Sequence, residues 1–231
     1  KNTDVRLKLR LIRFRPKIAG EIFKIGLPGA IQSAITSFSN VFVQGYINHF
    51  GADCMSGWTA YNKLDQLMFL PMQSVAMAAT TFVGQNVGAG DMVRAKKGTY
   101  RSLLLAEAFC VLFVPVLMIF APQLTAFFNA EPNVVEYGAL LLRLISPFYV
   151  LCCVNQIYAG ALGGAGDSKV PMYIMLGSFV AFRQVYLFVC SLFWNNVYTI
   201  ALAYPAGWIV ASSITLLYFH KVGLHKHKVV T

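Results

Sequence analysis

The chain has 231 residues, of which 57% are hydrophobic and 12% are charged, and its mean hydropathy is +0.60. Globular domains carry roughly 25% charged residues, so this composition excludes an ordinary soluble domain and indicates a protein that lies in a lipid bilayer. The net charge of +10 is divided among short clusters beside apolar segments and forms no continuous basic face, which argues against nucleic acid as a partner.

Six apolar segments follow one another along the chain, and each is near or above the ~20 residues that a helix needs to cross a bilayer. The sequence therefore predicts an all-α membrane protein, a bundle of six transmembrane helices. The predicted spans are residues 20–49, 57–85, 94–120, 134–159, 169–193 and 197–219. In this division, residues 1–19 form a cytoplasmic linker, 20–220 the transmembrane lobe and 221–231 a cytoplasmic tail.

The positive charges predict how these helices are oriented. Sixteen of the 19 Lys and Arg lie in the two terminal segments and in the connections at 85–101 and 160–169. The opposite connections, near 50–56, 121–133 and 194–196, hold none. Because Lys and Arg concentrate on the cytoplasmic side, we expect both termini to be cytoplasmic and the protein to lie in the plasma (inner) membrane.

The first span carries an unusual row of polar side chains. They stand four residues apart, so they follow one slowly winding face of a helix, and they are Gln32, Thr36, Asn40 and Gln44. Amides that face lipid are costly, so this row is expected to face another helix or water. Two interpretations stay open, namely hydrogen bonds between helices and the wall of a hydrated central cavity.

The second span repeats this mixture of amide and flexible apolar side chains. Flexible Met side chains suit a surface that accepts varied apolar ligands, although most Met residues at helical spacing are ordinary packing. The residues of this span that we predict to join the first row in a substrate cavity are Gln66, Met72, Gln73 and Met77.

Charged residues inside the predicted spans are candidates for function, because burying an ionisable group costs several kcal/mol unless it is paired. These residues are Lys63, Asp65, Glu107, Arg143 and Arg183. Asp65 has three interpretations: a carboxylate for ion coupling or substrate binding, one half of a structural charge pair with Arg143 or Arg183, or a contact with lipid headgroups. Glu107 is expected to be paired or to extend its carboxylate toward the membrane surface.

The five cysteines show no CxxC and no Cys/His spacing that would predict a metal site. Most of them lie in apolar segments, so we interpret them as reduced, buried thiols and predict no metal site. We also find no HExxH, no paired carboxylates at catalytic spacing and no Ser/His/Asp set, so an enzyme is not expected.

Two glycine-rich turns share the ending GAGD, namely GQNVGAGD at 84–91 and GALGGAGD at 160–167. Glycine supplies the positive φ that ends a helix, and the Asp can cap the helix that follows. A phosphate-binding loop is disfavoured because no GxxxxGK[ST] occurs. Helix termination is therefore the better interpretation of both turns.

Together with Ile25–Pro28 at the start of the first span, these turns resemble the MATE (multidrug and toxin extrusion) family. The third matching stretch runs on from Gly160 to Pro171. Members of this family have about twelve helices in two six-helix lobes around a central cavity. The resemblance implies that this chain is the second lobe, a fragment whose partner is the missing N-terminal lobe of the same polypeptide. The basic residues 1–17 are then the linker between the lobes.

The resemblance also implies a function. It predicts efflux of small amphiphilic, often cationic compounds from the bilayer by alternating access, in antiport with sodium ions or protons and with no other cofactor. Some members carry acidic residues at positions that fall here near Thr36 and Cys152, so those carboxylates cannot be carried over. The alternatives are a lipid-linked oligosaccharide flippase, which would favour a more strongly cationic cavity, and a membrane scaffold without transport.

Overall fold

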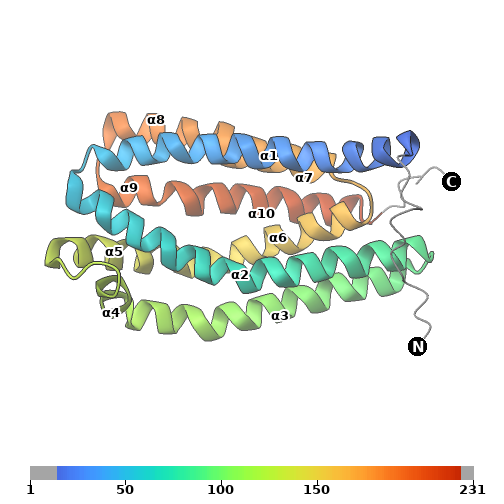
Figure 1. The fold of residues 1–231 in the computed structure, drawn as a ribbon, viewed down its shortest axis with the longest axis horizontal. Coiled ribbons are helices and arrows are strands. Elements are labelled where there is room, and N and C mark those ends of the chain that lie inside the picture. The colour runs from blue at the N-terminus through green and yellow to red at the C-terminus, as the bar shows by residue number, and fades with distance from the viewer. Residues whose placement is uncertain (1–14, 225–231) are drawn as a thin grey trace.

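The structure of the protein, a computed structural model, describes residues 15–224 and is helical throughout that range except for short connections (Figure 1). Its helices are α1 (Pro16–Asn48), α2 (Ala52–Gly88), α3 (Met92–Ile119), α4 (Ala121–Ala126), α5 (Pro132–Ile145), α6 (Tyr149–Gly164), α7 (Lys169–Leu176), α8 (Arg183–Phe193), α9 (Val197–Ala201) and α10 (Ala203–Lys221). The predicted linker and tail lie mostly outside the described residues.

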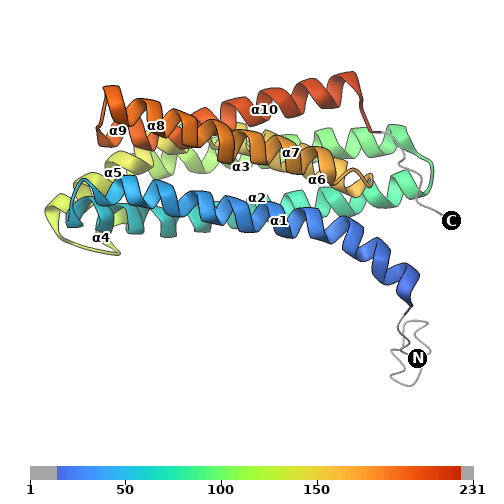
Figure 2. The same ribbon diagram turned by 90° about the horizontal axis from the view of Figure 1, so that it is seen from above.

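The helices form one bundle with their axes roughly along its long dimension (Figures 1 and 2). A 3₁₀ turn at Ser146–Phe148 joins α5 to α6, and a π-helical segment at Gly177–Phe182 joins α7 to α8. Each pair thus continues as one long element, and α9 runs on into α10 within the single stretch Val197–Lys221. The short α4 lies in the connection between α3 and α5, so the ten helices make six passes along the bundle. The all-helical, six-pass fold class predicted from the sequence is therefore confirmed.

Among the described residues, five helical stretches are long and apolar enough to span a membrane: Ala52–Gly88, Met92–Ile119, Pro132–Gly164, Lys169–Phe193 and Val197–Lys221. Helix α1 is not among them, although its 33 residues exceed the length that a span needs. Its polar row is the physical reason, because Gln, Ser, Thr and Asn side chains interrupt its apolar surface.

The two GAGD turns end helices as predicted, and they do so with the same backbone hydrogen bonds. Gly90 and Gly166 have positive φ values of 83° and 94°. The N–H groups of Asp91 and Asp167 each donate to a carbonyl five residues earlier, at 2.9 Å in both cases. The Asp91 carboxylate then accepts the Arg94 N–H at 2.9 Å, which caps α3.

Helix α2 is the central element, and it packs most extensively against α3, α5 and α6. Glycines allow the closest of these approaches. A Cβ built on Gly164 of α6 would lie 2.3 Å from the carbonyl oxygen of Thr80, and one built on Gly57 would lie 2.8 Å from the Cβ of Tyr137 on α5. The main core therefore gathers around α2, whereas α1 lies beside α7, α9 and the π-helical segment.

Candidate functional site

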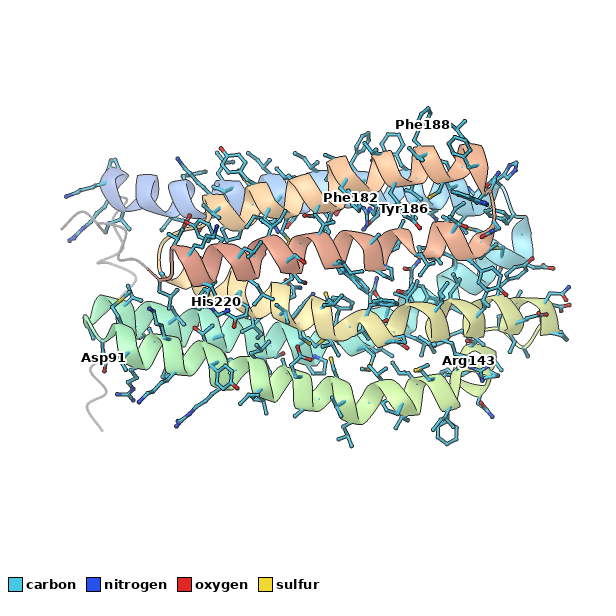
Figure 3. The ribbon with its side chains drawn as sticks, turned by 180° about the vertical axis from the view of Figure 1, so that it is seen from behind. Asp91, Arg143, Phe182, Tyr186, Phe188 and His220 are labelled. Carbon is cyan, nitrogen blue, oxygen red and sulfur yellow. The ribbon has the colours of Figure 1, made fainter. Side chains whose placement is uncertain are left out.

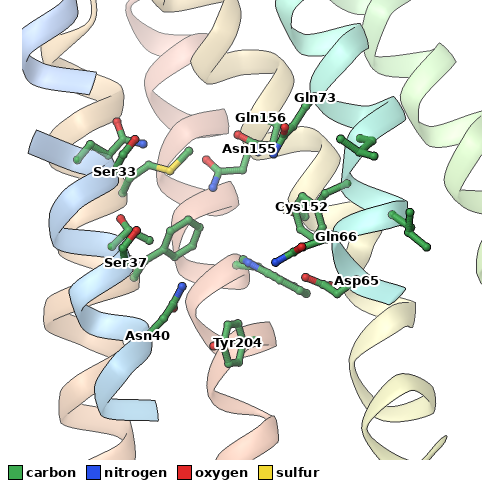
Figure 4. Close-up of a pocket in the computed structure, with 18 of the residues that line it drawn as sticks. Ser33, Ser37, Asn40, Asp65, Gln66, Gln73, Cys152, Asn155, Gln156 and Tyr204 are labelled. Carbon is green, nitrogen blue, oxygen red and sulfur yellow. The ribbon is translucent and has the colours of Figure 1, made fainter. Parts of the chain in front are cut away.

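A cavity of about 850 Å³ opens between α1 on one side and α2 and α6 on the other, with α7, α8 and α10 completing its wall. Figure 4 shows Ser33, Ser37 and Asn40 of α1 across from Asp65, Gln66 and Gln73 of α2. Residues Cys152, Asn155 and Gln156 of α6 and Tyr204 of α10 lie between them. This cavity brings together polar residues that were singled out in the sequence.

Five of the eight residues predicted to form a substrate cavity line this space: Gln32, Thr36, Asn40, Gln66 and Gln73. Gln44 does not, although it belongs to the same row. A step of four residues advances about 40° around a helix, so Gln44 is turned by about 120° from Gln32. The row therefore winds off the cavity before it reaches the end of α1.

The two predicted methionines also lie outside the lining. Met72 is 1% exposed and belongs to the core between α2, α3 and α6. Met77 is 71% exposed and lies about one turn beyond Gln73, past the end of the cavity. The apolar part of the wall is instead mainly aromatic, from Phe69, Phe128, Phe179, Tyr204 and Trp208.

Asp65 is held by two tyrosines and not by an arginine. The hydroxyls of Tyr61 and Tyr149 donate to its Oδ1 at 3.1 Å and 2.5 Å. Tyr61 is one turn earlier on α2, whereas Tyr149 begins α6, so the carboxylate links two core helices at the edge of the cavity. Neither tyrosine was predicted from the sequence as a partner of Asp65, although the four-residue spacing of Tyr61 and Asp65 was a usable signal.

The two arginines considered as partners of Asp65 bind elsewhere, so that pairing is wrong. Arg143 is exposed near the end of the bundle opposite Asp91 (Figure 3), and its Nε donates to the Met118 carbonyl at 3.0 Å. Arg183 is 4% exposed and lines the cavity. Its Nη2 donates to Ser39 Oγ at 2.7 Å and to Asn40 Oδ1 at 2.8 Å.

Arg183 brings positive charge to the cavity without an acidic group in contact with it. Its guanidinium lies 4.9 Å from the ring centre of Tyr204, and its Nε has no hydrogen-bond partner. Lys63, whose Nζ lies 5.3 Å from the ring centre of Phe128, also lines the cavity. The described wall therefore carries two cations and the single carboxylate of Asp65. Glu107 is not part of the lining, and its buried Oε2 has no hydrogen-bond partner.

A family profile described as MatE matches residues 28–189, which is more than half of the chain. The chain belongs to the MatE family. Its membership places it among membrane transporters and not among enzymes, as the sequence predicted. Thr36 and Cys152, the positions at which some members were expected to carry acids, both line the cavity.

Similar proteins are about twice as long. A probable multidrug resistance protein YpnP of Bacillus subtilis is 28% identical over 198 residues, covering 86% of this chain and 44% of that protein. A probable multidrug resistance protein NorM of Thermotoga maritima is 24% identical over 232 residues, covering 100% of this chain and 50% of that protein. The chain thus spans about half the length of the curated MatE relatives that it matches.

Solved structures show the same fold over half of their length. One of them is a MOP-superfamily transporter from Pyrococcus furiosus, which is described by the reversed polarity of its binding pocket. Its TM-score is 0.86 at 18% identity, and the match covers 95% of this chain. An outward-facing multidrug resistance MATE transporter has a TM-score of 0.84 and covers 95% of this chain and 49% of its own. An inward-facing structure of the same kind of transporter gives 0.76.

The polar row of α1 makes a direct prediction about water. Cysteines that replace Ser33 or Ser37, which line the cavity, should react with a water-soluble maleimide in membranes about tenfold faster than a cysteine at Phe38, because thiolates form only where water reaches the thiol. Phe38 is 64% exposed in the bundle but does not line the cavity. Equal protection of all three positions from the maleimide would contradict a hydrated cavity. Labelling of the unsubstituted protein gives the background from its own cysteines.

Proposed function

We propose that this chain is one lobe of a secondary antiporter that exports amphiphilic or cationic compounds in exchange for sodium ions or protons. The observation that carries the proposal is the cavity of about 850 Å³ in a MatE lobe, whose wall combines aromatic rings, amides and one carboxylate. Aromatic faces attract organic cations, amides adapt to varied polar groups, and the space suits a drug-sized molecule. The relatives named as probable multidrug resistance proteins agree with this function.

In this proposal the N-terminal lobe of the same polypeptide closes the open side of the cavity. The ends of the chain are cytoplasmic, because the basic residues Arg94, Lys96, Lys97 and Arg101 lie at the end of the bundle that holds both described termini. Alternating access then means that the two lobes expose the cavity to one side of the membrane at a time.

Asp65 is the group of this lobe that we propose for ion coupling. A carboxylate can hold a proton, a sodium ion or a cationic substrate, and these compete for the same negative charge. Competition of this kind produces exchange, because the outward-moving substrate leaves before the inward-moving ion binds. The hydroxyls of Tyr61 and Tyr149 keep the carboxylate at the cavity edge in either case.

The experiment uses proteoliposomes that contain the full-length polypeptide of which this lobe is part. An imposed sodium or pH gradient should drive a cationic amphiphilic dye against its concentration, and dissipating the gradient with an ionophore should stop the flux. The two gradients applied separately identify the coupling ion. Dye movement that follows the membrane potential equally in protein-free liposomes would contradict the proposal.

One observation favours a second function. Arg183 and Lys63 make the cavity more cationic than its amides alone predict, and a flippase for lipid-linked oligosaccharides needs positive charge for its pyrophosphate. The Pyrococcus furiosus structure, described by a binding pocket of reversed polarity and a different function, indicates that pocket polarity varies on this fold.

Arg183→Gln separates the two functions. Glutamine can still donate to Ser39 and Asn40 but carries no charge, so an exporter of cations should keep its dye flux within about threefold, whereas a flippase should lose about tenfold or more of its lipid transport. Arg183→Lys, which keeps the charge, is the matched control. Dye flux that falls with Gln and recovers with Lys would contradict the exporter and support an anionic substrate.

A further inference from the structure

Three sulfur atoms from three different helices meet in the core beside the cavity. The Sγ of Cys153 on α6 lies 3.1 Å from the Sδ of Met72 on α2 and 3.2 Å from the Sγ of Cys110 on α3. The third side of this triangle, from Cys110 Sγ to Met72 Sδ, measures 3.6 Å. Both cysteines are free thiols that are 0% exposed, and Met72 is 1% exposed.

We propose that Met72, Cys110 and Cys153 form a binding site for one soft monovalent metal ion, Cu(I) or Ag(I). Thiol and thioether sulfurs are soft ligands that select such ions and bind hard cations such as sodium poorly. The site is therefore distinct from any site for the coupling ion, and it does not depend on the function proposed above.

The triangle is smaller than the ligand triangle of a planar three-sulfur site, so the sulfurs must move apart when an ion binds. A point in its plane that is equidistant from the three sulfurs lies about 1.9 Å from each, which is shorter than a metal–sulfur bond of about 2.3 Å. An ion about 1.3 Å above the plane reaches about 2.3 Å from all three sulfurs. The flexible side chain of Met72 allows part of this movement, and small χ1 rotations of Cys110 and Cys153 allow the rest.

The charges also favour a monovalent ion. One thiol that loses its proton to solvent (M⁺ + R–SH → R–S–M + H⁺) gives a neutral unit, while the second thiol and the thioether remain neutral donors. A neutral unit is the least costly one to hold among apolar side chains. Glu107 lies one turn before Cys110 on α3, and its buried Oε2 has no hydrogen-bond partner among the described residues. It therefore offers a hydrogen-bond acceptor near the Cys110 side of the site.

An ion can reach this site from the cavity. Cys152, the residue before Cys153, lines the cavity, so in this proposal a soft ion binds first at its thiol and then moves to the adjacent sulfurs. Bound there, the ion would join α2, α3 and α6 at the level of the cavity. Because the ion would link three helices, its binding would make the lobe more rigid.

The test titrates the purified full-length protein, kept anaerobic and reduced, with Cu(I) against a competing Cu(I) chelator and, separately, with Ag(I). We expect the double variant Cys110→Ala, Cys153→Ala to bind one ion fewer per chain. Met72→Leu should weaken the same site about tenfold while it preserves the volume of the side chain. X-ray absorption of the Cu(I) form should show about three sulfur neighbours at about 2.3 Å, a spectrum that altered packing alone would not produce.

The control variant is Cys54→Ala, which removes a buried thiol outside the triangle. It should leave the stoichiometry and the affinity unchanged. The proposal fails if the double variant binds as many ions as the unsubstituted protein while it remains monodisperse. It also fails if Met72→Leu has no effect and mild oxidation joins Cys110 to Cys153, because the pair would then be a dithiol and not a metal site.

Discussion

Replacing Asp65 by Asn in the full-length protein should reduce gradient-driven export of a cationic dye by about tenfold or more, because a neutral amide takes up no proton and binds a sodium ion much more weakly than a carboxylate does. The fold should survive this change. An amide oxygen can still accept the hydrogen bonds that Tyr61 and Tyr149 donate to Oδ1. The measurement is dye flux in proteoliposomes under an imposed sodium or pH gradient, with the same flux at zero gradient as the reference.

Two control variants test whether the loss of export is specific to the Asp65 carboxylate. Glu107→Gln removes a half-buried carboxylate of α3 that does not line the cavity, and it should leave coupling within about twofold. Tyr149→Phe removes one hydrogen bond but keeps the carboxylate, so coupling should persist in weakened form. Undiminished gradient-driven export by Asp65→Asn would assign Asp65 a purely structural role between α2 and α6.

Replacing Gly164 by Ala should produce the largest loss of stability that a single added methyl group causes in this lobe. The new Cβ would lie 2.3 Å from the carbonyl oxygen of Thr80 and 3.1 Å from its carbonyl carbon. Both atoms are backbone, so α2 and α6 must separate. Overpacking of this kind costs about 3 kcal/mol, which corresponds to a fall of about 10 °C in the melting temperature for a domain of this size.

Gly163→Ala is the matched control, because a Cβ on the neighbouring residue meets no atom within 4 Å. It should leave the melting temperature unchanged or raise it slightly, since Ala is the better helix former. The measurement is thermal unfolding of the detergent-solubilised protein, followed by the loss of its monodisperse peak. Equal melting temperatures for the two variants would show that α2 and α6 are less closely packed at Thr80 than the structure indicates.

Periodicity and turn chemistry in the sequence were sufficient to predict the six passes, because both signals are local. The GAGD turns, for example, need only a glycine at positive φ and a capping carboxylate within a few residues. The cavity-facing part of the α1 row was also predictable from its spacing. Its far end was not, since the spacing shows that the row winds but not where along α1 the cavity ends.

Contacts between distant helices could not be predicted in the same way. A pair with an arginine was one interpretation of Asp65, because opposite charges attract, but two tyrosine hydroxyls satisfy it at less cost than a second buried charge. Met72 was assigned to the cavity from its spacing on α2. Its actual partners, Cys110 and Cys153, come from two other helices and have no shared sequence pattern.

The π-helical segment Gly177–Phe182 changes how the span from Lys169 to Phe193 must be drawn on a helical wheel. A π turn contains more residues than an α turn, so side chains after the segment are rotated by about 100° from the positions that an uninterrupted α-helix would give them. Residues of α7 and α8 that share a face on a wheel drawn for an uninterrupted α-helix therefore do not share a face in the molecule. This register change presents Arg183 to Ser39 and Asn40 of α1, and a wheel for this span has to be restarted at Arg183.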